Sequence, residues 1–158
     1  MTTHLKTCGL EILGPVLNAT GAETAARLRL PLFLAGVQAG FPSPADDFID
    51  KRLDLTEHLI PHPAATFFVR AAGSSMLGAG IHDGDLLIVD RAEEARAGRV
   101  VIAAVHGELT VKRLERRGER LLLAPANPDY PPIDVTEAAE KGEGFEVWGV
   151  VTHVIHKL

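Results

Sequence analysis

The sequence predicts a mainly β protein, and three observations indicate this fold class. Short runs of branched or bulky residues follow one another from residue 66 onward, as is typical of strands. Glycine-containing pairs separate these runs and indicate turns. Aromatic residues make up only 5% of the chain, so the core would consist mostly of Val, Leu, Ile and Ala. Such residues suit twisted antiparallel sheets.

The expected strands are short and lie close together along the chain. They cover residues 66–71, 86–90, 99–105, 108–114, 120–124 and 146–156. His106-Gly107 separates two of these runs by two residues, which predicts a tight hairpin turn, although His is a less common first residue there than Asn or Asp. The strands are therefore expected to form antiparallel meanders.

The first 44 residues are predicted to form a short arm that is partly helical or extended. Thr20 and Glu23 fit a capping box, and the helix they begin would run through Leu30 until Pro31 ends it. Residues 36–44 contain several glycines and prolines, so this part is expected to be extended and exposed. Two further helical segments are expected, beginning at Pro44 and covering residues 55–60.

Length and charge restrict the possible functions. With 158 residues, of which 46% are hydrophobic, the chain can bury one core of ordinary size. Beyond Ala39, 19 acidic residues outnumber 13 basic residues. Because nucleic-acid binding depends mainly on Lys and Arg, we expect no direct sequence-specific DNA binding, and any nucleic acid would be reached through a protein partner.

The single cysteine and the hydropathy pattern indicate the compartment. Cys8 is the only cysteine, so no intramolecular disulfide can form, as is usual in a reducing compartment. No apolar run approaches the roughly 20 residues of a membrane span, and the N-terminus does not resemble a secretory signal. We therefore expect a soluble, cytoplasmic protein with no membrane contact.

Ser75 and Lys112 are the candidate catalytic residues. A serine needs a base that takes its proton as it attacks, and a lysine can act as that base only when neutral. Since the reference pKa of lysine is about 10.4, the amine would have to be desolvated. Each residue also has an ordinary interpretation, because serines near glycines commonly form turns and Lys112-Arg113 could face solvent on a strand.

Three segments together resemble one family. Residues 67–76 (FFVRAAGSSM), 80–90 (GIHDGDLLIVD) and 110–114 (TVKRL) are similar to the self-cleaving serine peptidases of the LexA and UmuD group. The resemblance runs from about Pro31 to His156. Three further segments are most similar to the UmuD branch, the mutagenesis subunit induced by DNA damage. They are residues 41–46 (FPSPAD), 52–55 (RLDL) and 101–105 (VIAAV).

The resemblance implies a fold and a set of roles. The fold would be the C-terminal peptidase fold of this family. Ser75 would be the nucleophile and Lys112 the general base, with the backbone N–H groups of Ser74 and Ser75 as an oxyanion hole. The bond cut would be Ala39–Gly40. Residues 1–39 would then be an arm removed by self-cleavage, and residues 40–158 the peptidase and dimerisation domain.

The resemblance also implies partners. A RecA filament on single-stranded DNA would stimulate cleavage in the SOS response. The activated fragment would form a homodimer and join a UmuC-like, error-prone Y-family polymerase in translesion synthesis. Three alternatives stay open: a structural accessory subunit without proteolysis, a LexA-like regulator, and a protease that acts on other proteins. The LexA branch carries a winged-helix domain before its cleavage site, and only 39 residues precede Gly40 here, which disfavours operator binding.

The histidines do not predict a metal site. His153 and His156 are three positions apart in an expected strand and would point to opposite faces. Pro61 interrupts the spacing between His58 and His62. The run Asp83-Gly84-Asp85 is best explained as a tight turn. We therefore expect no metal and no cofactor.

Overall fold

The computed structural model describes residues 11–15, 29–33 and 49–158. The chain divides into two compact units, one formed by residues 1–18 and 62–158 and the other by residues 19–61. Scissile-bond candidates Ala39 and Gly40, and the helix expected from Pro44, lie outside the described residues. The domain boundary at Gly40 stays a prediction, because the two compact units do not show where the chain is cut.

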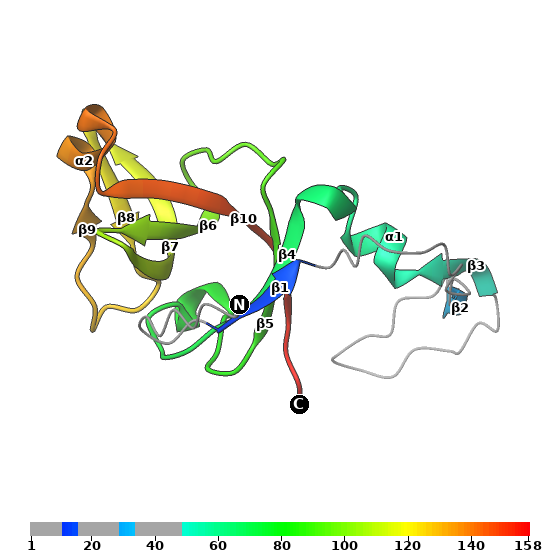
Figure 1. Cartoon of the computed structure of the whole chain (residues 1–158). Coiled ribbons are helices and arrows are strands. Elements are labelled where there is room, and N and C mark those ends of the chain that lie inside the picture. The colour runs from blue at the N-terminus through cyan, green and yellow to red at the C-terminus, as the bar shows by residue number, and fades with distance from the viewer. Residues whose placement is uncertain (1–10, 16–28, 34–48) are drawn as a thin grey trace. The chain divides into compact units, whose positions relative to one another are not determined.

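The larger unit is built on one sheet of eight antiparallel strands, shown in Figure 1. In sheet order these are β1 (Glu11–Pro15), β4 (Thr66–Arg70), β5 (Leu86–Asp90), β10 (Phe145–Ile155), β6 (Val100–Val105), β7 (Glu108–Arg117), β8 (Arg120–Ala124) and β9 (Ile133–Asp134). All six expected strands are found within a few residues of their predicted ends. The mainly β, antiparallel fold class is confirmed.

Strand β10 joins the two halves of the sheet, since it pairs with β5 along one part and with β6 along another. The register shifts between Val147 and Gly149 and again between Val151 and His153, and such bulges bend a strand. A Cβ atom at Gly149 would lie 2.8 Å from Cγ1 of Val89. Gly149 therefore permits the close approach of β10 to β5.

Buried apolar side chains form two clusters. One contains Phe67, Val69, Ala71, Met76, Ile81, Leu87, Val89, Ile102, Leu109 and Val111. The other contains Val101, Ala103, Leu114, Leu123, Val135 and Val150. Because neighbouring residues of a strand point to opposite faces, the clusters lie on the two faces of β6. Both faces of the central strands are thus buried, which explains their nearly continuous apolar sequences.

The β6–β7 connection is the predicted hairpin. His106 has φ of 49° and Gly107 has φ of 86°, and Val105 pairs directly with Glu108 across the turn. Positive φ at both central residues defines a type I′ turn, whose twist matches that of the flanking strands. The turn prediction at His106-Gly107 is confirmed, with a histidine in the left-handed position.

The smaller unit contains a two-stranded antiparallel sheet and one short helix. Strand β2 (Arg29–Phe33) pairs with β3 (Ile49–Asp54), and α1 (Leu55–Leu59) follows at once. The Asp54 carboxylate accepts hydrogen bonds from the backbone N–H groups of Thr56 and Glu57 and so caps the helix. The expected turn at residues 55–60 is confirmed.

The prediction of helix through Leu30 is wrong. Leu30 lies in β2, where it pairs with Leu53 of β3. At Leu30, pairing with a strand more than twenty residues away overrides the local helix propensity. Thr20 and Glu23 themselves lie outside the described residues.

Strand β3 was also not predicted, and neither were β1, β9 and α2. Strand β1 pairs with β4 at the edge of the large sheet. Strand β9 has only two residues, and α2 (Thr136–Lys141) follows it. Gly142, with φ of 68°, ends α2 in the left-handed conformation, a common helix stop. Two 3₁₀ turns, η1 (Pro63–Ala65) and η2 (Leu77–Ala79), complete the described elements.

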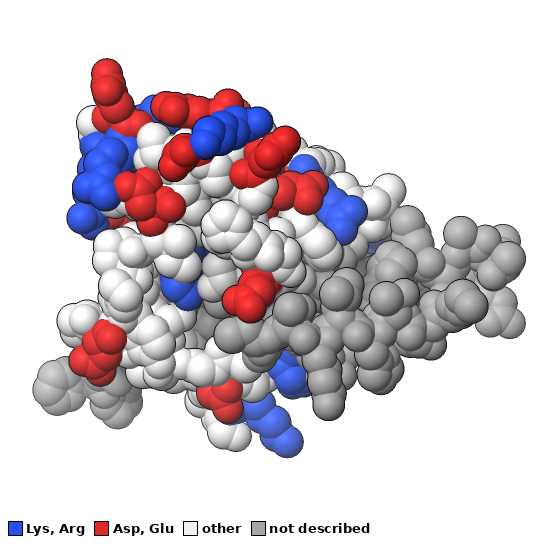
Figure 2. All heavy atoms as spheres, turned by 60° about the vertical axis from the view of Figure 1, so that its left-hand side comes forward, with Lys and Arg blue, Asp and Glu red and all other residues white. Residues whose placement is uncertain are grey.

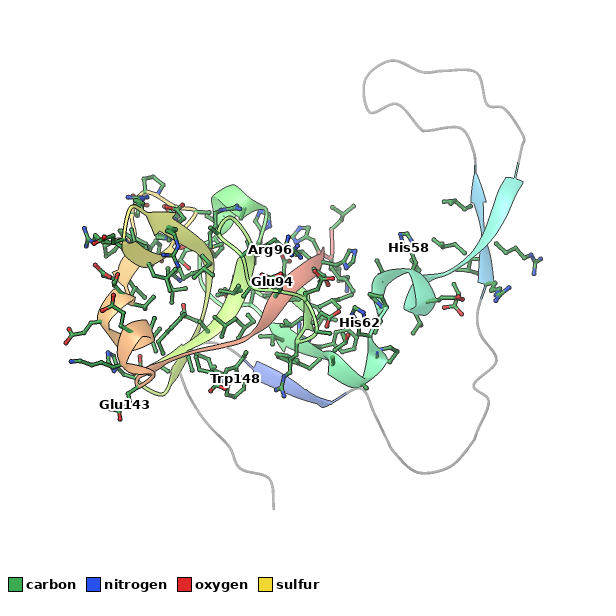
Figure 3. The ribbon with its side chains drawn as sticks, turned by 90° about the horizontal axis from the view of Figure 1, so that it is seen from above. His58, His62, Glu94, Arg96, Glu143 and Trp148 are labelled. Carbon is green, nitrogen blue, oxygen red and sulfur yellow. The ribbon has the colours of Figure 1, made fainter. Side chains whose placement is uncertain are left out.

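Surface charges are mixed. On the face drawn in Figure 2, acidic and basic side chains of the described residues alternate at one end and do not gather into a continuous basic area. Glu94 and Arg96, labelled in Figure 3, form an exposed ion pair, with 2.5 Å between Oε2 and the guanidinium. Among the described residues, no helix has both the length and the apolar character needed to cross a membrane.

Candidate active site

Lys112 lies in the middle of β7, and the residue is only 8% exposed. It pairs directly with Val101 of β6, a fully buried residue. Directly paired residues share a face of the sheet, and Leu114 lies two positions along the same face. Lys112 therefore extends from an apolar face, an environment that disfavours the charged form of an amine.

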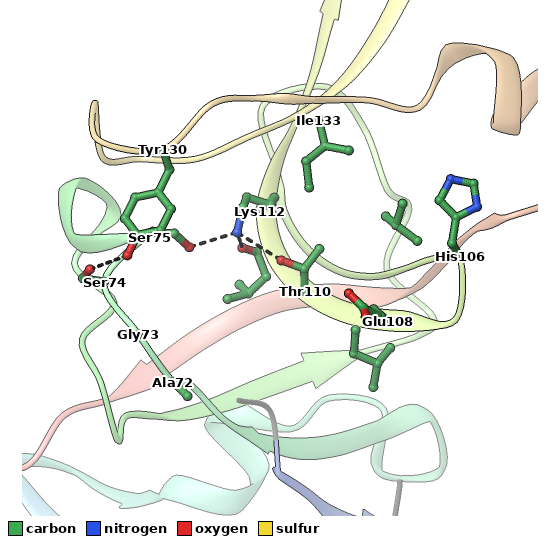
Figure 4. Close-up of a pocket in the computed structure, with 13 residues that line it drawn as sticks. Ala72, Gly73, Ser74, Ser75, His106, Glu108, Thr110, Lys112, Tyr130 and Ile133 are labelled. Carbon is green, nitrogen blue, oxygen red and sulfur yellow. Dashed lines mark hydrogen bonds between the residues drawn. The ribbon is translucent and has the colours of Figure 1, made fainter. Parts of the chain in front are cut away.

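Three oxygen atoms surround the lysine amine at hydrogen-bonding distance, as Figure 4 shows in part. The Nζ atom lies 2.9 Å from Oγ of Ser75, 3.0 Å from Oγ1 of Thr110 and 3.0 Å from the backbone oxygen of Val111. A neutral amine has two N–H donors and one lone pair. It can donate to Val111 and Thr110 and direct its lone pair at the Ser75 hydroxyl, the arrangement that a general base requires.

Ser75 lies in the loop between β4 and β5, and the segment after β8 holds this loop in place. The Ala126 N–H donates to the backbone oxygen of Ser75 at 2.9 Å, and the Gly78 N–H donates to the backbone oxygen of Ala126 at 2.7 Å. A Cβ atom at Gly78 would lie 2.6 Å from that same oxygen. Only glycine fits this contact without a shift of the backbone.

Ser74 is held by the same segment. Its hydroxyl lies 2.9 Å from the Tyr130 hydroxyl, as Figure 4 shows. The Asn127 side-chain amide donates to the Ser74 backbone oxygen at 2.9 Å. The next residue after Ser75, Met76, is 2% exposed and anchors the loop in the core. The nucleophile candidate thus has fixed neighbours on both sides.

The backbone N–H groups of Gly73, Ser74 and Ser75 differ in whether they have a hydrogen-bond acceptor. Gly73 adopts φ of 84°, and its N–H donates to the Asp83 carboxylate at 2.7 Å. Among the described residues, none accepts a hydrogen bond from the backbone N–H of Ser74 or Ser75. Such N–H groups can bind an oxygen atom of a ligand.

A pocket of about 640 Å³ opens beside the serine and the lysine. It is lined by Ala72, Gly73, Ser74, Ser75, Val105, His106, Glu108, Leu109, Thr110, Val111, Lys112, Tyr130 and Ile133. Most of these side chains are small or apolar, as is usual for ligand pockets. The pocket can accept an extended peptide segment with small apolar side chains.

The fold brings Ser75 and Lys112 into contact although 37 positions separate them. Sequence reasoning missed Asn127 and Tyr130, since they come from a connection with no regular pattern. The sequence analysis included Thr110 only in the segment 110–114 and gave it no role. The spacing of two residues on a strand was the signal that could have indicated Thr110 as a hydrogen-bonding partner of the amine.

Comparison with known proteins agrees with this architecture. Residues 31–152 match the model of the Peptidase S24-like family. Protein SamA of Salmonella typhimurium is 49% identical over 127 residues, which cover 80% of this chain and 85% of SamA. Protein MucA of Escherichia coli is 47% identical over 124 residues, which cover 78% and 82%. The LexA repressor of Azoarcus sp. is 41% identical over 151 residues, which cover 92% and 73%.

The chain therefore belongs to the S24 family of self-cleaving serine peptidases. SamA and MucA are homologues of UmuD, and with them the chain falls among the self-cleaving proteins of SOS mutagenesis that assist an error-prone polymerase. The predicted family and its UmuD branch are confirmed.

Proposed function

We propose that the chain cuts its own Ala39–Gly40 bond with Ser75 as nucleophile and Lys112 as general base. The Ser75 oxygen attacks the carbonyl carbon of Ala39 as the serine proton passes to the lysine amine. The bond to Gly40 then breaks, and Lys112 returns the proton to the leaving amine. Water hydrolyses the ester between Ser75 and Ala39, which restores the serine.

One observation supports this assignment above the others. The amine of Lys112, a residue that is 8% exposed, lies 2.9 Å from the serine hydroxyl, within the range needed for proton transfer. The apolar face around Val101 and Leu114 disfavours the ammonium form. The alternative that Lys112 is an ordinary strand residue facing solvent does not agree with this burial.

The loop also supports an oxyanion hole at Ser74 and Ser75. Their backbone N–H groups have no acceptor among the described residues, and hydrogen bonds with Asn127, Ala126 and Tyr130 fix the loop that carries them. Donors that are fixed before the reaction stabilise developing negative charge most effectively. The Ala39 carbonyl oxygen would be their ligand.

Cleavage would act as a switch between two forms of the protein. It would separate residues 1–39 from a fragment of residues 40–158, and because the substrate is tethered to the enzyme, even a slow site can act once per molecule. The similarity to UmuD supports stimulation by a RecA filament on single-stranded DNA. It also supports a homodimer of the fragment that joins a Y-family polymerase in the cytoplasm.

Fragment masses test this proposal. The full chain is incubated at alkaline pH, and separately at neutral pH with RecA filaments on single-stranded DNA. We expect one new species with the mass of residues 40–158, together with its partner of residues 1–39. The Ser75→Ala variant is the control and is expected to stay intact.

Three outcomes would contradict the proposal in different ways. The same fragment from Ser75→Ala would remove Ser75 from the mechanism. A fragment that begins elsewhere would overturn the assignment of Ala39–Gly40. A wild-type chain that stays intact under both conditions would favour an accessory subunit without proteolysis.

A further inference from the structure

Two histidines and a buried carboxylate meet outside the residues that line the active-site pocket. Asp85 is 3% exposed. Its Oδ1 lies 2.6 Å from Nδ1 of His156, and its Oδ2 lies 3.6 Å from Nδ1 of His82. Burial raises the pKa of Asp85, but hydrogen bonds from the His82 N–H and from His156 outweigh it and hold this pKa below its usual value.

The donor atoms of these three residues all lie within 4.8 Å of one another. Two ligand atoms of a tetrahedral zinc ion, each at about 2.0–2.1 Å, are about 3.3 Å apart. The 2.6 Å separation joins His156 to Oδ1 and the 3.6 Å separation joins His82 to Oδ2, so each histidine approaches a different oxygen of the carboxylate at a distance close to this value. The histidine side chains are 50% and 46% exposed, so both rings can turn slightly toward one ion.

We propose that His82, Asp85 and His156 form a binding site for a divalent transition-metal ion, with Zn²⁺ as the ion that fits best. Imidazole nitrogens and a carboxylate oxygen are common zinc ligands. Three protein ligands leave a fourth position for water. The spacing of histidines in the sequence did not indicate this site, because His82 and His156 come from distant segments.

A second cluster in the same unit makes a useful contrast. His62, labelled in Figure 3, lies 2.7 Å from Oδ2 of Asp90, and Glu93 is near them. This cluster has one imidazole, and the guanidinium of Arg99 lies 3.5 Å from Glu93. A cation already competes for that carboxylate. The cluster around Asp85 has two imidazoles and is the better metal site.

A bound ion would connect two parts of the larger unit. His156 directly follows β10, whereas His82 and Asp85 flank the turn before β5. Asp83 in this turn accepts the Gly73 N–H at 2.7 Å, and Gly73 is two residues before Ser75. Metal binding to the folded state stabilises it by mass action. The ion would therefore stiffen the turn that supports the loop carrying the nucleophile.

Metal titration of the untagged full-length chain tests the site. Co²⁺ is the probe, because its visible absorption reports the coordinating atoms, and Zn²⁺ is then added to displace it. We expect one Co²⁺ per chain, displacement by Zn²⁺, and a rise in unfolding temperature with Zn²⁺. His82→Gln and His156→Gln should each weaken binding more than about tenfold, since loss of an outer-shell partner alone commonly weakens it 10–100-fold.

Matched controls use the other residues that could bind metal. His62→Gln, His153→Gln and Cys8→Ser should each bind Co²⁺ as the wild type does. Because His82 and His156 are exposed, their glutamine variants are expected to fold, which circular dichroism can check. The proposal is overturned if the wild type binds no Co²⁺, if both glutamine variants bind it normally, or if only a control variant loses it.

Discussion

Two lysines in the larger unit show how environment decides the role of a side chain. Lys112 is 8% exposed, and its amine contacts the Ser75 hydroxyl. Lys141, at the end of α2, has a side chain that is 65% exposed and pairs with the Glu137 carboxylate one helical turn away. An exposed pair of this kind contributes about 0.3–0.5 kcal/mol. Burial beside a hydroxyl instead makes an amine available as a base.

Replacing each lysine by methionine should separate these two roles most strongly. We expect Lys112→Met to slow self-cleavage at alkaline pH by at least about 10³-fold, because the serine loses its proton acceptor. Lys141→Met should leave the rate within about twofold. The rate is measured from the disappearance of the full-length chain on gels.

A Lys112→Met variant that cleaves within about tenfold of the wild type would contradict the role of Lys112. Unfolding curves of both variants show whether each is folded. Methionine in a buried position commonly maintains stability, so loss of cleavage in a stable variant would report chemistry.

The next largest effect is expected from a substitution at Gly78, which supports the loop that carries Ser75. In Gly78→Ala the new Cβ would lie 2.6 Å from the Ala126 oxygen, so the backbone must shift and the hydrogen bond between Gly78 and Ala126 is strained. We expect a loss of about 1–3 kcal/mol in the free energy of unfolding, measured by urea denaturation, together with slower cleavage. Leu77→Ala, at the exposed neighbouring position, should change the stability by less than about 1 kcal/mol. Equal stability of Gly78→Ala and the wild type would contradict the proposed contact.

Substitutions at Thr110 test one hydrogen bond of the Lys112 amine. We expect Thr110→Val to slow self-cleavage about tenfold, since one hydrogen bond of about 1.4 kcal/mol no longer positions the amine. Thr110→Ser keeps the hydroxyl and should recover most of the rate. If valine and serine behave alike, the hydroxyl does not position Lys112.

The smallest effect is expected at the exposed surface. Asp134 accepts hydrogen bonds from the Thr136 side chain and backbone and from Arg120, which lower its pKa from 3.8 to about 2. A lowered pKa in the folded state means that the ionised carboxylate stabilises the fold above about pH 4 and that this contribution is lost as the pH falls toward 2. Asp134→Asn should therefore be slightly less stable than the wild type at neutral pH.

The difference between Asp134→Asn and the wild type should shrink as the pH falls from about 4 to about 2. Denaturation curves at several pH values measure it. A difference that stays constant over this range would show that the carboxylate charge is not the cause.

The strands were predictable because their sequence signals are local. The run from Leu86 to Asp90 and the turn at His106-Gly107 carry their own patterns of branched residues and glycine. The strand at Arg29–Phe33 was not predictable, because its structure depends on pairing with β3. The 2.9 Å contact between Ser75 and Lys112 follows from sheet order, which no local pattern reports.

Supporting contacts of the site were even less accessible from sequence. Asn127 and Tyr130 lie in an irregular connection, and the cluster of His82 with His156 requires two distant segments to meet. The family resemblance could indicate Ser75 and Lys112 as candidates for the nucleophile and the base, because their flanking residues match a known pattern. The resemblance gave no indication of the pair His82 and His156, because the segments quoted for it were matched only to the peptidase site.

The pH dependence of self-cleavage tests the central claim most directly. If the neutral Lys112 amine takes the serine proton, the rate should rise steadily from about pH 7 to about pH 10, as more of the amine loses its own proton. Circular dichroism over the same range verifies that the chain stays folded. A rate that stays flat across this range in a folded chain would contradict the claim.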